Sequence, residues 1–598
     1  MWRSVDELTC DDLISEYEST HGVALNAIAP IEVNNLAITQ ANMLFGENDK
    51  YAIEAVSDLI ARQSLSESVE EFLPGYKREI VEMLKRRLRL LGTLEATSIA
   101  QSHALGRLKM ILEAKRDGRK KGRLILQGFR EPKEWDEGSV ASPVAYPSSL
   151  RTLLFHAGPR SDVISLNDVS VAFLQSNPYP KDQAPRYVEY QPYAHSHKWL
   201  FELMGSIYGQ RSASREWFKT ISSWLISEGF VGDDSDQVCN HVTSAQSHKR
   251  GRNEPCLFIN PTTQMKVLLY VDDICARGSL VESNKFHDAL EKRFDCREGS
   301  RQFLSPSNPL DFTGITITME VGDTLDSYYL DQSSAIASFL VSHNLDKVKT
   351  QESPMPNPKQ LTSNSELVDE ATKTWCKSVN GQLHYFARGT RWDITHATSR
   401  LSALNSNPTL GMVDSIHQIA GYLKGTLGFR LGGMRRLSGD DITTFTDSDH
   451  IGDKAITFKS RTGVLILLNG IPCHWRSNKQ PKTSDSPACA EIYALKEGVK
   501  DARLFHWVAH EMGIDAPFPF CVKVDSTQAK SFAEDTCAKS KIRGSFDMRE
   551  AWIQEVRDDT VVEIEQVDTS INLADLFTKC LPRLKFVDMR DRILHYFK

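Results

Sequence analysis

The sequence predicts a multidomain protein of mixed α and β class. The chain has 598 residues, which is more than one hydrophobic core usually serves. Stretches with apolar residues at three- and four-residue spacing, typical of helices, occur among short apolar runs bounded by glycine, proline or asparagine, typical of strands. The hydrophobic (40%) and charged (25%) fractions are those of an ordinary globular protein, so we expect packed domains.

The composition also limits the setting in which the protein works. No apolar run approaches the roughly 18 residues of a membrane helix, and the acidic start "MWRSVDELTC" lacks the pattern of a secretory signal. The eleven cysteines form no CxxC pair and no Cys/His cluster at zinc spacing. We therefore expect reduced thiols and a cytoplasmic or nuclear protein without membrane contact.

Charge alone does not identify a partner. The net charge of −7 argues against a polyanion-binding surface over the whole chain. Two basic patches, "KRRLRLLG" from Lys85 and "KRDGRKKGRLILQGFR" from Lys115, would permit one locally. Because a charge run is more often a solvated face, both readings stay open.

The first third of the chain reads as helices followed by a strand. The first 75 residues mix acidic stretches with helical patterns such as "KYAIEAVSDLIARQ" and carry no recognisable chemistry. Helical periodicity continues from Tyr76 to about Lys115. "GRLILQGF" then predicts a strand closed by a glycine turn.

The middle of the chain predicts a sheet with helices beside it. "DVISLNDVSVAFLQ" predicts a strand turning into a helix, and "SREWFKTISSWLISEGF" an amphipathic helix stopped by Gly229. The polar stretch 237–266 predicts a surface loop, and "KVLLYVDDICARG" two strands joined at adjacent aspartates. "PLDFTGITITME" and "YYLDQ" predict further strands.

A connector rich in proline, asparagine and serine, "SPMPNPKQLTSNSE", predicts a domain boundary near residue 360. Helical patterns follow in "VNGQLHYFARGTRWDITHATSRLSAL" and "SIHQIAGYLKG". After the connector "GGMRRLSGD", strands are predicted in "ITTFTDSD", "TGVLILLNGIPCHW" and "FCVKVD", and a helix in "ACAEIYALKEGVKDARLFHWVAHEMG".

Adjacent aspartates inside an apolar ribbon are unusual. Asp272 and Asp273 join two predicted strands, and Asp168 ends another. If these strands are neighbours, three carboxylates can converge and offer the oxygen ligands that Mg²⁺ prefers, which would also relieve their mutual repulsion. The alternative is an ordinary acidic turn, since so short a motif is weak by itself.

Four motifs taken together resemble a known family. "YVDDI" resembles the catalytic hairpin of reverse transcriptases, and "LNDVSVAFLQS" the DVKTAFLNG strand of copia-type retrotransposon polymerases. "SIYGQRSASREWF" resembles that family's LYGLKQSPRxWY helix, and "KKGRLILQGF" its KARLVAKGF strand. From about Tyr76 onward, the chain therefore resembles the reverse transcriptase and ribonuclease H portion of a copia-type LTR retrotransposon Pol polyprotein.

This resemblance implies a polymerase site. Asp168, Asp272 and Asp273 would bind two Mg²⁺ ions, or Mn²⁺ in their place. The incoming deoxynucleoside triphosphate would be bound by residues that contact its phosphates, sugar and base, namely Lys121, Arg123, Phe173, Tyr208 and Gly209. Arg215 and Lys424 would contact nucleic acid. Alternatives stay open for each of these roles. Lys121 and Arg123 could lie on a solvated strand face, and Phe173 could be a core residue. Arg215 could serve only helix packing, and Lys424 could be an exposed lysine without a partner.

Four motifs near the C-terminus resemble ribonuclease H domains. "TFTDSDHIGD", "ACAEIYAL", "KVDSTQA" and "NLADLFTKCLPRLKF" resemble the family's YSDADWAGD, TEAEYxAL, CDNxSAI and QLADIFTKPLPRxKF. The resemblance implies four metal-binding carboxylates at Asp447, Glu491, Asp525 and Asp575, with two Mg²⁺ ions between them. Acidic residues so far apart in sequence would otherwise look like surface charge.

The implied architecture is a right-hand polymerase with fingers, palm and thumb, followed by a ribonuclease H-like mixed sheet. "GQLHYFARGTRWDITHA" and "GYLKGTLGFRL" resemble the family's GSLxYLxxTRPDIxYA and RYLKGTxxxGL, which places the thumb between the catalytic parts. We expect four regions. Residues 1–75 would be a partly helical segment of unknown role, and residues 76–345 the fingers and palm. Residues 346–438 would be the thumb and connection, and residues 439–598 the ribonuclease H-like domain.

Several residues depart from the family's patterns. Ser214 replaces a proline, Cys489 a glutamate, and Ser545 and Ala551 two histidines, the first of which is thought to assist ribonuclease cleavage. All seven metal-binding carboxylates are nevertheless present. There is no CCHC zinc knuckle, HHCC site, integrase core or protease D-[ST]-G triplet, so we expect a piece of a longer polyprotein or a truncated element.

The resulting expectation is an RNA-directed DNA polymerase with RNA–DNA hybrid ribonuclease activity. Its partners would be an RNA template, a DNA primer, the hybrid, deoxynucleoside triphosphates and other parts of the Pol polyprotein, in a cytoplasmic virus-like particle or the nucleus. The alternative is a catalytically degenerate or co-opted remnant that binds nucleic acid without turnover.

Overall fold

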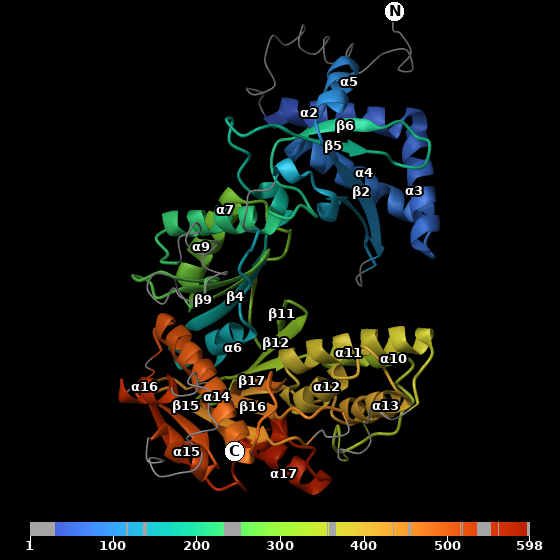
Figure 1. Cartoon of the computed structure of the whole chain (residues 1–598). Coiled ribbons are helices and arrows are strands. Elements are labelled where there is room, and N and C mark those ends of the chain that lie inside the picture. Colours follow the sequence, from blue (N-terminus) through green and yellow to red (C-terminus); the bar gives the residue numbers. More distant parts are fainter. Residues whose placement is uncertain are drawn as a thin grey trace, which may run out of the picture. The chain divides into compact units, whose positions relative to one another are not determined.

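The computed structural model in Figure 1 shows a mixed α/β protein of several sheets, as the sequence predicts. The residues that it describes are 30–114, 118–135, 140–232, 253–355, 357, 361, 366–434, 436–452, 456–514, 516, 518–534, 552–559 and 561–594, with side chains from residue 36 onward.

The chain forms two compact units. The first contains Met1–Pro143, Val169–Gly251 and Lys292–Asp295, and the second Val144–Asp168, Arg252–Glu291 and Cys296–Lys598.

The first unit is built on one five-stranded sheet. Its strands, in spatial order, are β1 (Leu88–Leu90), β6 (Trp199–Leu203), β5 (Arg186–Tyr190), β2 (Leu105–Ala114) and β3 (Lys120–Leu126). The long helices before the sheet are α2 (Pro30–Phe45), α3 (Lys50–Gln63), α4 (Val69–Arg86) and α5 (Thr93–Ser102). A capping box between Ser68 and Glu71 starts α4, whose apolar face packs on β3.

The remaining elements of this unit are mostly short. They are η3 (Glu47–Asp49), η4 (Gly128–Arg130), η5 (Lys133–Trp135), η6 (Ala172–Gln175) and the amphipathic helix α7 (Ala213–Ser227). The helix predicted in "SREWFKTISSWLISEGF" is confirmed, and its stop at Gly229 has the expected positive φ of 84°.

Two predictions for the first half of the chain are wrong. The helical periodicity expected from Tyr76 to about Lys115 is interrupted by β1 and ends with α5, because β2 follows as a strand. Its buried residues, Gly106, Leu108, Met110 and Leu112, alternate with less buried ones, which is a period of two rather than 3.6. Of the loop expected at 237–266, residues 237–252 lie outside the described residues, and the remainder contains strand β7 (Leu257–Ile259), whose three residues are all buried and pair with β8.

The second unit contains three sheets, the first of which holds the paired aspartates. Its spatial order is β10 (Gln302–Phe303), β4 (Asp162–Asp168), β9 (Asp273–Ser279), β8 (Lys266–Tyr270) and β7. Helices α6 (Pro147–Phe155) and α9 (Leu280–Arg293) adjoin these strands in sequence, and all neighbouring strands run antiparallel.

The second sheet of this unit is a four-stranded meander followed by helices. Its strands are β11 (Leu310–Phe312), β12 (Ile315–Glu320), β13 (Ser327–Asp331) and β14 (Leu431–Met434). The helices are α10 (Ser333–Ser342), α11 (Glu370–Gly389), η8 (Trp392–Ile394), α12 (Thr395–Ser402) and α13 (Leu410–Gly425). The strands and helices predicted for this part of the chain are therefore confirmed, but the stretch "GGMRRLSGD" predicted as a connector begins inside β14, so that prediction is wrong in part.

The third sheet combines antiparallel and parallel strands. Its order is β17 (Ile471–Lys479), β16 (Arg461–Leu468), β15 (Ile442–Asp449), β18 (Phe520–Val524) and β19 (Val562–Gln566), and β15–β18 and β18–β19 are parallel pairs. The remaining elements are α14 (Pro487–Glu511), α15 (Thr527–Ala533), α16 (Trp552–Asp558), η11 (Leu573–Phe577) and α17 (Arg583–Leu594). All eight residues of β16 are buried, which makes this strand the centre of the core.

Within the described ranges, no helix is both long enough and apolar enough to span a membrane.

Candidate active sites

Strand register brings the predicted polymerase aspartates together. In the β4–β9 ladder Asp168 lies directly opposite Asp273, and in the β8–β9 hairpin Asp273 lies opposite Tyr270. The turn between these strands is Val271 and Asp272, with Val271 at a φ of 60°, an unfavourable conformation for a β-branched residue. Asp272 therefore belongs to a tight turn, and the strand register places Asp168 and Asp273 opposite each other.

The electrostatics of this corner favour a cation. Burial, together with the neighbouring Asp272 and Asp168 carboxylates, raises the pKa of Asp273 to about 7, against the opposing effect of Arg297. Arg297 already pairs with Asp168, with 3.1 Å between its Nη1 and Oδ2. These oxygen donors fit the ligand preference of Mg²⁺.

A network of polar side chains that the sequence did not predict contacts the backbone of Asp168 and the neighbouring Asn167. The Asn167 side-chain oxygen accepts hydrogen bonds from the Asp168 amide (2.9 Å) and from Ser300 Oγ (2.6 Å). Its Nδ2 donates to Glu291 Oε1 of α9 (3.1 Å). The Arg297 amide donates to the Asp168 carbonyl (2.9 Å). No local pattern in the sequence points to these residues, because they meet only through the fold.

Four of the predicted nucleotide-binding residues meet in the first unit. The Arg123 guanidinium lies over the Tyr208 ring at 5.3 Å, and Phe173 meets the same ring edge-on at 5.7 Å. Gly209 follows with a φ of 80°, and a Cβ there would collide with the Leu126 carbonyl oxygen. The site thus joins β3, η6 and the segment after β6.

The other predicted contact residues lie on ordinary elements. Lys121 shares a face of β3 with Arg123, and both cations act on the buried Glu79 carboxyl. Arg215 is half-buried on α7. Lys424, near the end of α13, donates from Nζ to the Val348 carbonyl at 3.1 Å.

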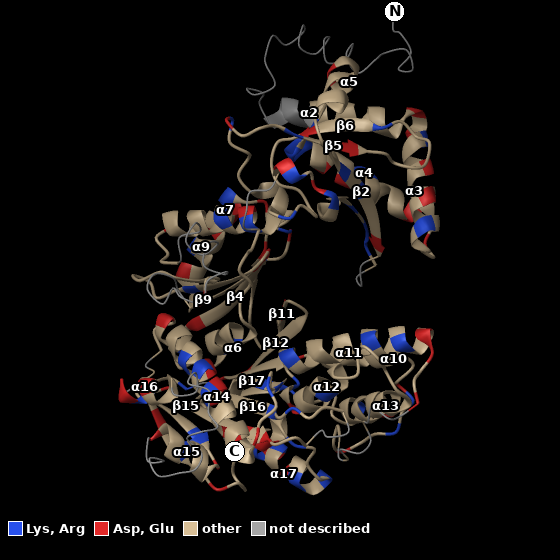
Figure 2. Ribbon diagram, viewed as in Figure 1, with Lys and Arg blue, Asp and Glu red and all other residues tan. Residues whose placement is uncertain are grey.

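The first basic patch mostly serves contacts within the first unit. Arg86 pairs with Glu82 and Asp295, and Arg89 with Glu95 and Glu202. In the described part of the chain, basic and acidic residues are interspersed along the ribbon (Figure 2). Part of the second patch, at 115–117, lies outside the described residues.

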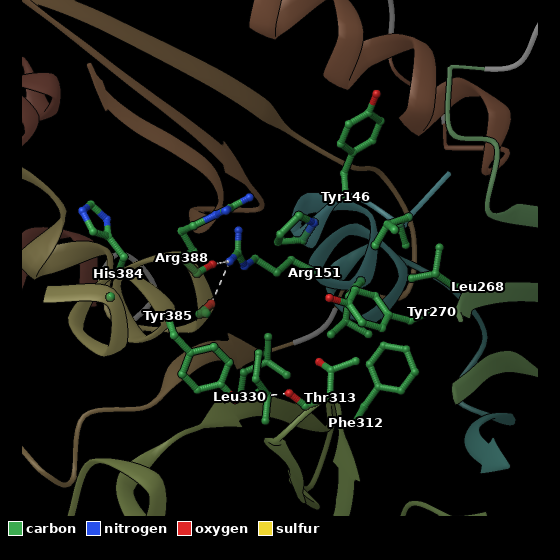
Figure 3. A pocket seen from close by; sticks show the side chains of 17 residues that line it. Tyr146, Arg151, Leu268, Tyr270, Phe312, Thr313, Leu330, His384, Tyr385 and Arg388 are labelled. Atoms are coloured by element: carbon green, nitrogen blue, oxygen red, sulfur yellow. Dashed lines mark hydrogen bonds between the residues drawn. The ribbon is translucent and has the colours of Figure 1, made fainter. Parts of the chain in front are cut away.

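A cavity of about 400 Å³ lies beside the aspartate hairpin in the second unit (Figure 3). Tyr270 packs edge-on against Phe312, with 6.3 Å between ring centroids. On the α11 side, Tyr385 Oη donates to the Gly314 carbonyl at 3.0 Å. Apolar and aromatic side chains therefore form much of the wall next to the hairpin.

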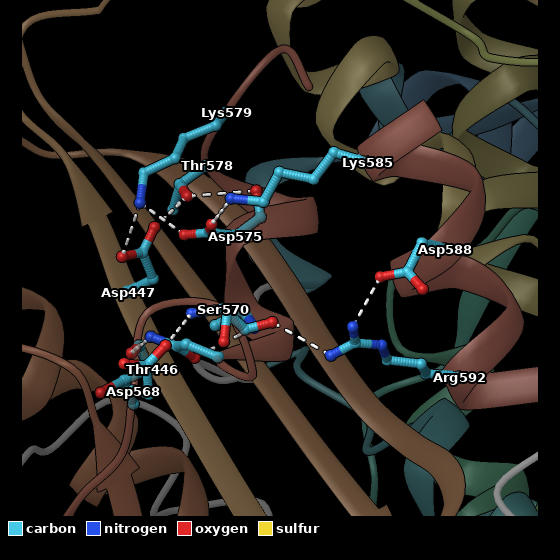
Figure 4. Close-up of polar contacts among 12 residues, drawn as sticks. Thr446, Asp447, Asp568, Ser570, Asp575, Thr578, Lys579, Lys585, Asp588 and Arg592 are labelled. Atoms are coloured by element: carbon cyan, nitrogen blue, oxygen red, sulfur yellow. Dashed lines mark hydrogen bonds and ion pairs between the residues drawn. The ribbon is translucent and has the colours of Figure 1, made fainter. Parts of the chain in front are cut away.

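The third sheet carries an acidic cluster, of which Figure 4 shows Asp447 and Asp575. Asp447 lies on β15, Asp525 directly after β18 and Asp575 in η11, and one carboxylate oxygen of each lies within 4.8 Å of the others. Asp447 and Asp575 are almost fully buried, at 1% and 0% exposure. The parallel pairing of β15 with β18 brings Asp447 and Asp525 to the same end of the sheet.

Donors from the C-terminal segment satisfy two carboxylates of this cluster, those of Asp447 and Asp575. Thr578 Oγ1 donates to Asp447 Oδ2, and Lys579 Nζ to Asp447 Oδ1 at 3.2 Å and to Asp575 Oδ1. Lys585 Nζ donates to Asp575 Oδ2 at 2.8 Å. These three donors lie in or next to "NLADLFTKCLPRLKF", so the motif was recognised from sequence, but their contacts were not.

Burial and like charge disfavour ionisation of the cluster. Burial raises the pKa of Asp447 to about 7, with Lys579 opposing and Asp575 adding to the rise. The pKa of Glu491, on α14, is raised well above its usual range by burial and then by Asp447 and Asp525. A buried group of carboxylate oxygens held this closely has the chemistry of a Mg²⁺ site, for which Asp447, Asp525 and Asp575 would be the nearest ligands.

Two of the sequence departures can be placed and two cannot. Cys489 lies in the first turn of α14, where Ser486 caps the helix by accepting from the Cys489 amide at 3.2 Å. Ser214 is half-buried in the first turn of α7. Ser545 and Ala551 lie outside the described residues.

Comparison with known proteins agrees with this geometry. Residues 107–356 match the family described as reverse transcriptase (RNA-dependent DNA polymerase). This part of the chain is therefore similar to reverse transcriptase domains. Asp168, Asp272 and Asp273 lie inside the matched range, as do the predicted nucleotide-binding residues, whereas the acidic cluster of the third sheet lies outside it.

Similarity to retrotransposon polyproteins extends over most of the chain. It is 26% identical over 550 residues (88% of the chain) to the Retrovirus-related Pol polyprotein from transposon TNT 1-94 of Nicotiana tabacum. It is 25% identical over 590 residues (96%) to that from transposon RE1 of Arabidopsis thaliana, and 22% over 539 residues (88%) to the Transposon TyH3 Gag-Pol polyprotein of Saccharomyces cerevisiae. The predicted resemblance to copia-type Pol polyproteins is confirmed. The alignments cover 39%, 36% and 29% of the length of these relatives.

Proposed function

We propose that the chain is an RNA-directed DNA polymerase joined to a ribonuclease that cleaves the RNA strand of RNA–DNA hybrids. The pairing of Asp168 with Asp273 across adjacent strands, inside the reverse transcriptase domain, carries this proposal. The buried acidic cluster at Asp447, Asp525 and Asp575 supports the second activity. Under this proposal the third sheet is the ribonuclease H part, and the reverse transcriptase match contains fingers and palm.

In the polymerase centre, Asp168, Asp272 and Asp273 would hold divalent metal, for which Mg²⁺ is the proposed ion. When bound, the metal would activate the primer hydroxyl and balance the charge of the leaving pyrophosphate. Arg297 and Asn167 would orient Asp168, because they contact its carboxylate and its amide. Arg123 and Lys121 would pair with the triphosphate of the nucleotide, and Phe173 would contact its sugar.

In the ribonuclease centre, Asp447, Glu491, Asp525 and Asp575 would hold the metal that activates the attacking water. Burial excludes bulk water from Asp447 and Asp575, which strengthens their interaction with any cation. Thr578 donates to one Asp447 oxygen and Lys579 donates to the other.

Extension of a DNA primer on an RNA template tests the polymerase. The wild-type chain with Mg²⁺ and deoxynucleotides should extend the primer, and the double variant Asp272→Asn plus Asp273→Asn should lose at least 100-fold in rate, an order of magnitude typical of lost charge stabilisation. Equal extension by both proteins would refute the polymerase and favour a binding remnant.

Hydrolysis of a labelled RNA–DNA hybrid tests the ribonuclease separately. Asp525→Asn should abolish RNA cleavage while primer extension continues, and Asp168→Asn should do the opposite. A protein that binds hybrid tightly but cleaves it no faster than Asp525→Asn would be a nucleic-acid-binding remnant in this region.

A further inference from the structure

Lys579 lies between two carboxylates of the ribonuclease cluster (Figure 4). Its Nζ donates both to Asp447 Oδ1, at 3.2 Å, and to Asp575 Oδ1. The two carboxylates come from elements more than one hundred residues apart in sequence, β15 and η11. One ammonium group therefore joins two buried, like-charged side chains that would otherwise repel each other.

The same oxygen atoms would be needed by a metal ion. All four carboxylate oxygens of Asp447 and Asp575 accept hydrogen bonds from Thr578, Lys579 or Lys585. Mg²⁺ coordinates carboxylate oxygens at roughly 2.0–2.1 Å, and a divalent cation at that distance strongly repels an ammonium on the same atoms. The lysine and the metal are competitors for these ligands.

We propose that Lys579 is a tethered cation of this centre: it holds Asp447 and Asp575 together, and it leaves at least one of them when Mg²⁺ is coordinated. Lys579 is thus a positioning residue that sets the metal concentration at which the centre loads. The inference rests on the proposed function for the identity of the centre, and its tests measure metal binding rather than cleavage.

The geometry distinguishes Lys579 from its neighbour Lys585. Lys585 reaches the cluster from α17 and contacts only Asp575, through the oxygen that Lys579 does not use. Lys579 bridges both carboxylates and is 34% exposed, so its long flexible side chain has solvent into which its ammonium can move. Replacing Lys585 is therefore the matched control for replacing Lys579.

Chemical labelling of the wild-type chain tests displacement directly. Lysines are acylated with an amine-reactive reagent at fixed pH, in EDTA or in saturating Mg²⁺, and quantified by mass spectrometry. Acylation of Lys579 should increase at least threefold with Mg²⁺, while Lys500, which pairs with Glu497 on the surface of α14, should not change. Unchanged or reduced labelling of Lys579 in Mg²⁺ would overturn the proposal.

Metal affinity supplies a second test. Titration with Mn²⁺, followed by its electron paramagnetic resonance, should show that Lys579→Met binds at least tenfold more tightly than wild type at this centre, because a competing charge is gone. Lys585→Met should change the affinity less than threefold. Unchanged or weaker binding by a folded Lys579→Met would refute the inference, and if that variant does not fold, the labelling of the wild-type chain decides.

These readouts separate the two proposals. If Lys579 responds to Mg²⁺ but the chain does not cleave hybrid, the lysine–metal competition stands and the ribonuclease function fails. If the chain cleaves hybrid in an Asp525-dependent way but the labelling of Lys579 does not change with Mg²⁺, the lysine–metal competition fails and the ribonuclease function stands.

Discussion

At the scale of single residues, backbone conformation explains one of the predicted binding residues. Gly209 was assigned to the nucleotide site by resemblance. In the structure its positive φ and its contact with the Leu126 carbonyl both require the absence of a Cβ. The requirement is thus a physical one, independent of the role that the glycine has in binding.

We expect Gly209→Ala to weaken nucleotide binding selectively. The added methyl must displace the β3 backbone or Tyr208, so KM for deoxynucleotides should increase at least tenfold, while hybrid cleavage stays as in wild type. Steady-state primer extension measures this. Gly439→Ala is the control, since Gly439 also has a positive φ but open space around its Cβ position; an equal KM effect in both would contradict the steric explanation.

Glu79 is a second residue whose importance appears only in the fold. It lies on α4 beneath β3, where its Oε1 accepts from the Leu124 amide at 2.8 Å. Burial raises its pKa to about 7, against the opposing effects of Lys121 and Arg123. Because the folded-state pKa is above the unfolded one, this carboxyl stabilises the fold at low pH, and the contribution is lost as pH increases from about 4.5 to about 7.

Glu79→Gln should therefore make the first unit less sensitive to pH. Glutamine keeps the acceptor for Leu124 but does not ionise, so at pH 8 the free energy of unfolding should exceed that of wild type by up to about 3 kcal/mol. Hydrogen exchange of the β3 amides between pH 5 and 8 measures this. A wild-type pH slope in Glu79→Gln would disprove the assignment.

At the scale of elements, the last residues of strand β4 are held in place by hydrogen bonds to the Asn167 side chain. Asn167 connects the Asp168 amide, Ser300 and α9, so the direction of the last strand residue is set by side chains from later in the chain. Such support determines how well a carboxylate is held in position for metal binding.

Asn167→Ala should reduce polymerase turnover about tenfold or more, within the range expected when an outer-shell partner of a metal ligand is lost. The Mg²⁺ concentration for half-maximal extension should increase as well, because Asp168 is less well oriented. Hybrid cleavage by the same preparation is the control for folding. An unchanged Mg²⁺ dependence would show that Asn167 is only a packing residue.

At the scale of the whole molecule, Arg151 contacts elements of the second unit that are far apart in sequence. From α6 it donates to the carbonyls of Cys473 on β17 (2.9 Å) and Gly389 at the end of α11 (2.7 Å), and its guanidinium stacks on Trp475 at 3.8 Å. Elements separated by more than 300 residues in sequence thus share one buried cation.

Arg151→Leu should destabilise the second unit by about 3 kcal/mol or more, since it leaves buried carbonyls without donors. Thermal inactivation should then remove polymerase and ribonuclease activities together at a lower temperature. Arg583→Ala is the control, because the ion pair of Arg583 with Glu352 is exposed at both side chains. Loss of only one activity in Arg151→Leu would show that the two parts are stabilised separately.

The sequence by itself determined the class of fold and most strands and helices, and it indicated candidate acidic residues, because periodicity and short motifs are local properties. It misassigned β2 as a helix, because the spacing of its apolar residues is compatible with both a helix and a strand, and only the alternating burial shows the strand. It could not reveal that Asp168 faces Asp273, that Asn167 supports it, or that Lys579 bridges Asp447 and Asp575. Those relations depend on strand register and on contacts between distant segments, which only the tertiary structure decides.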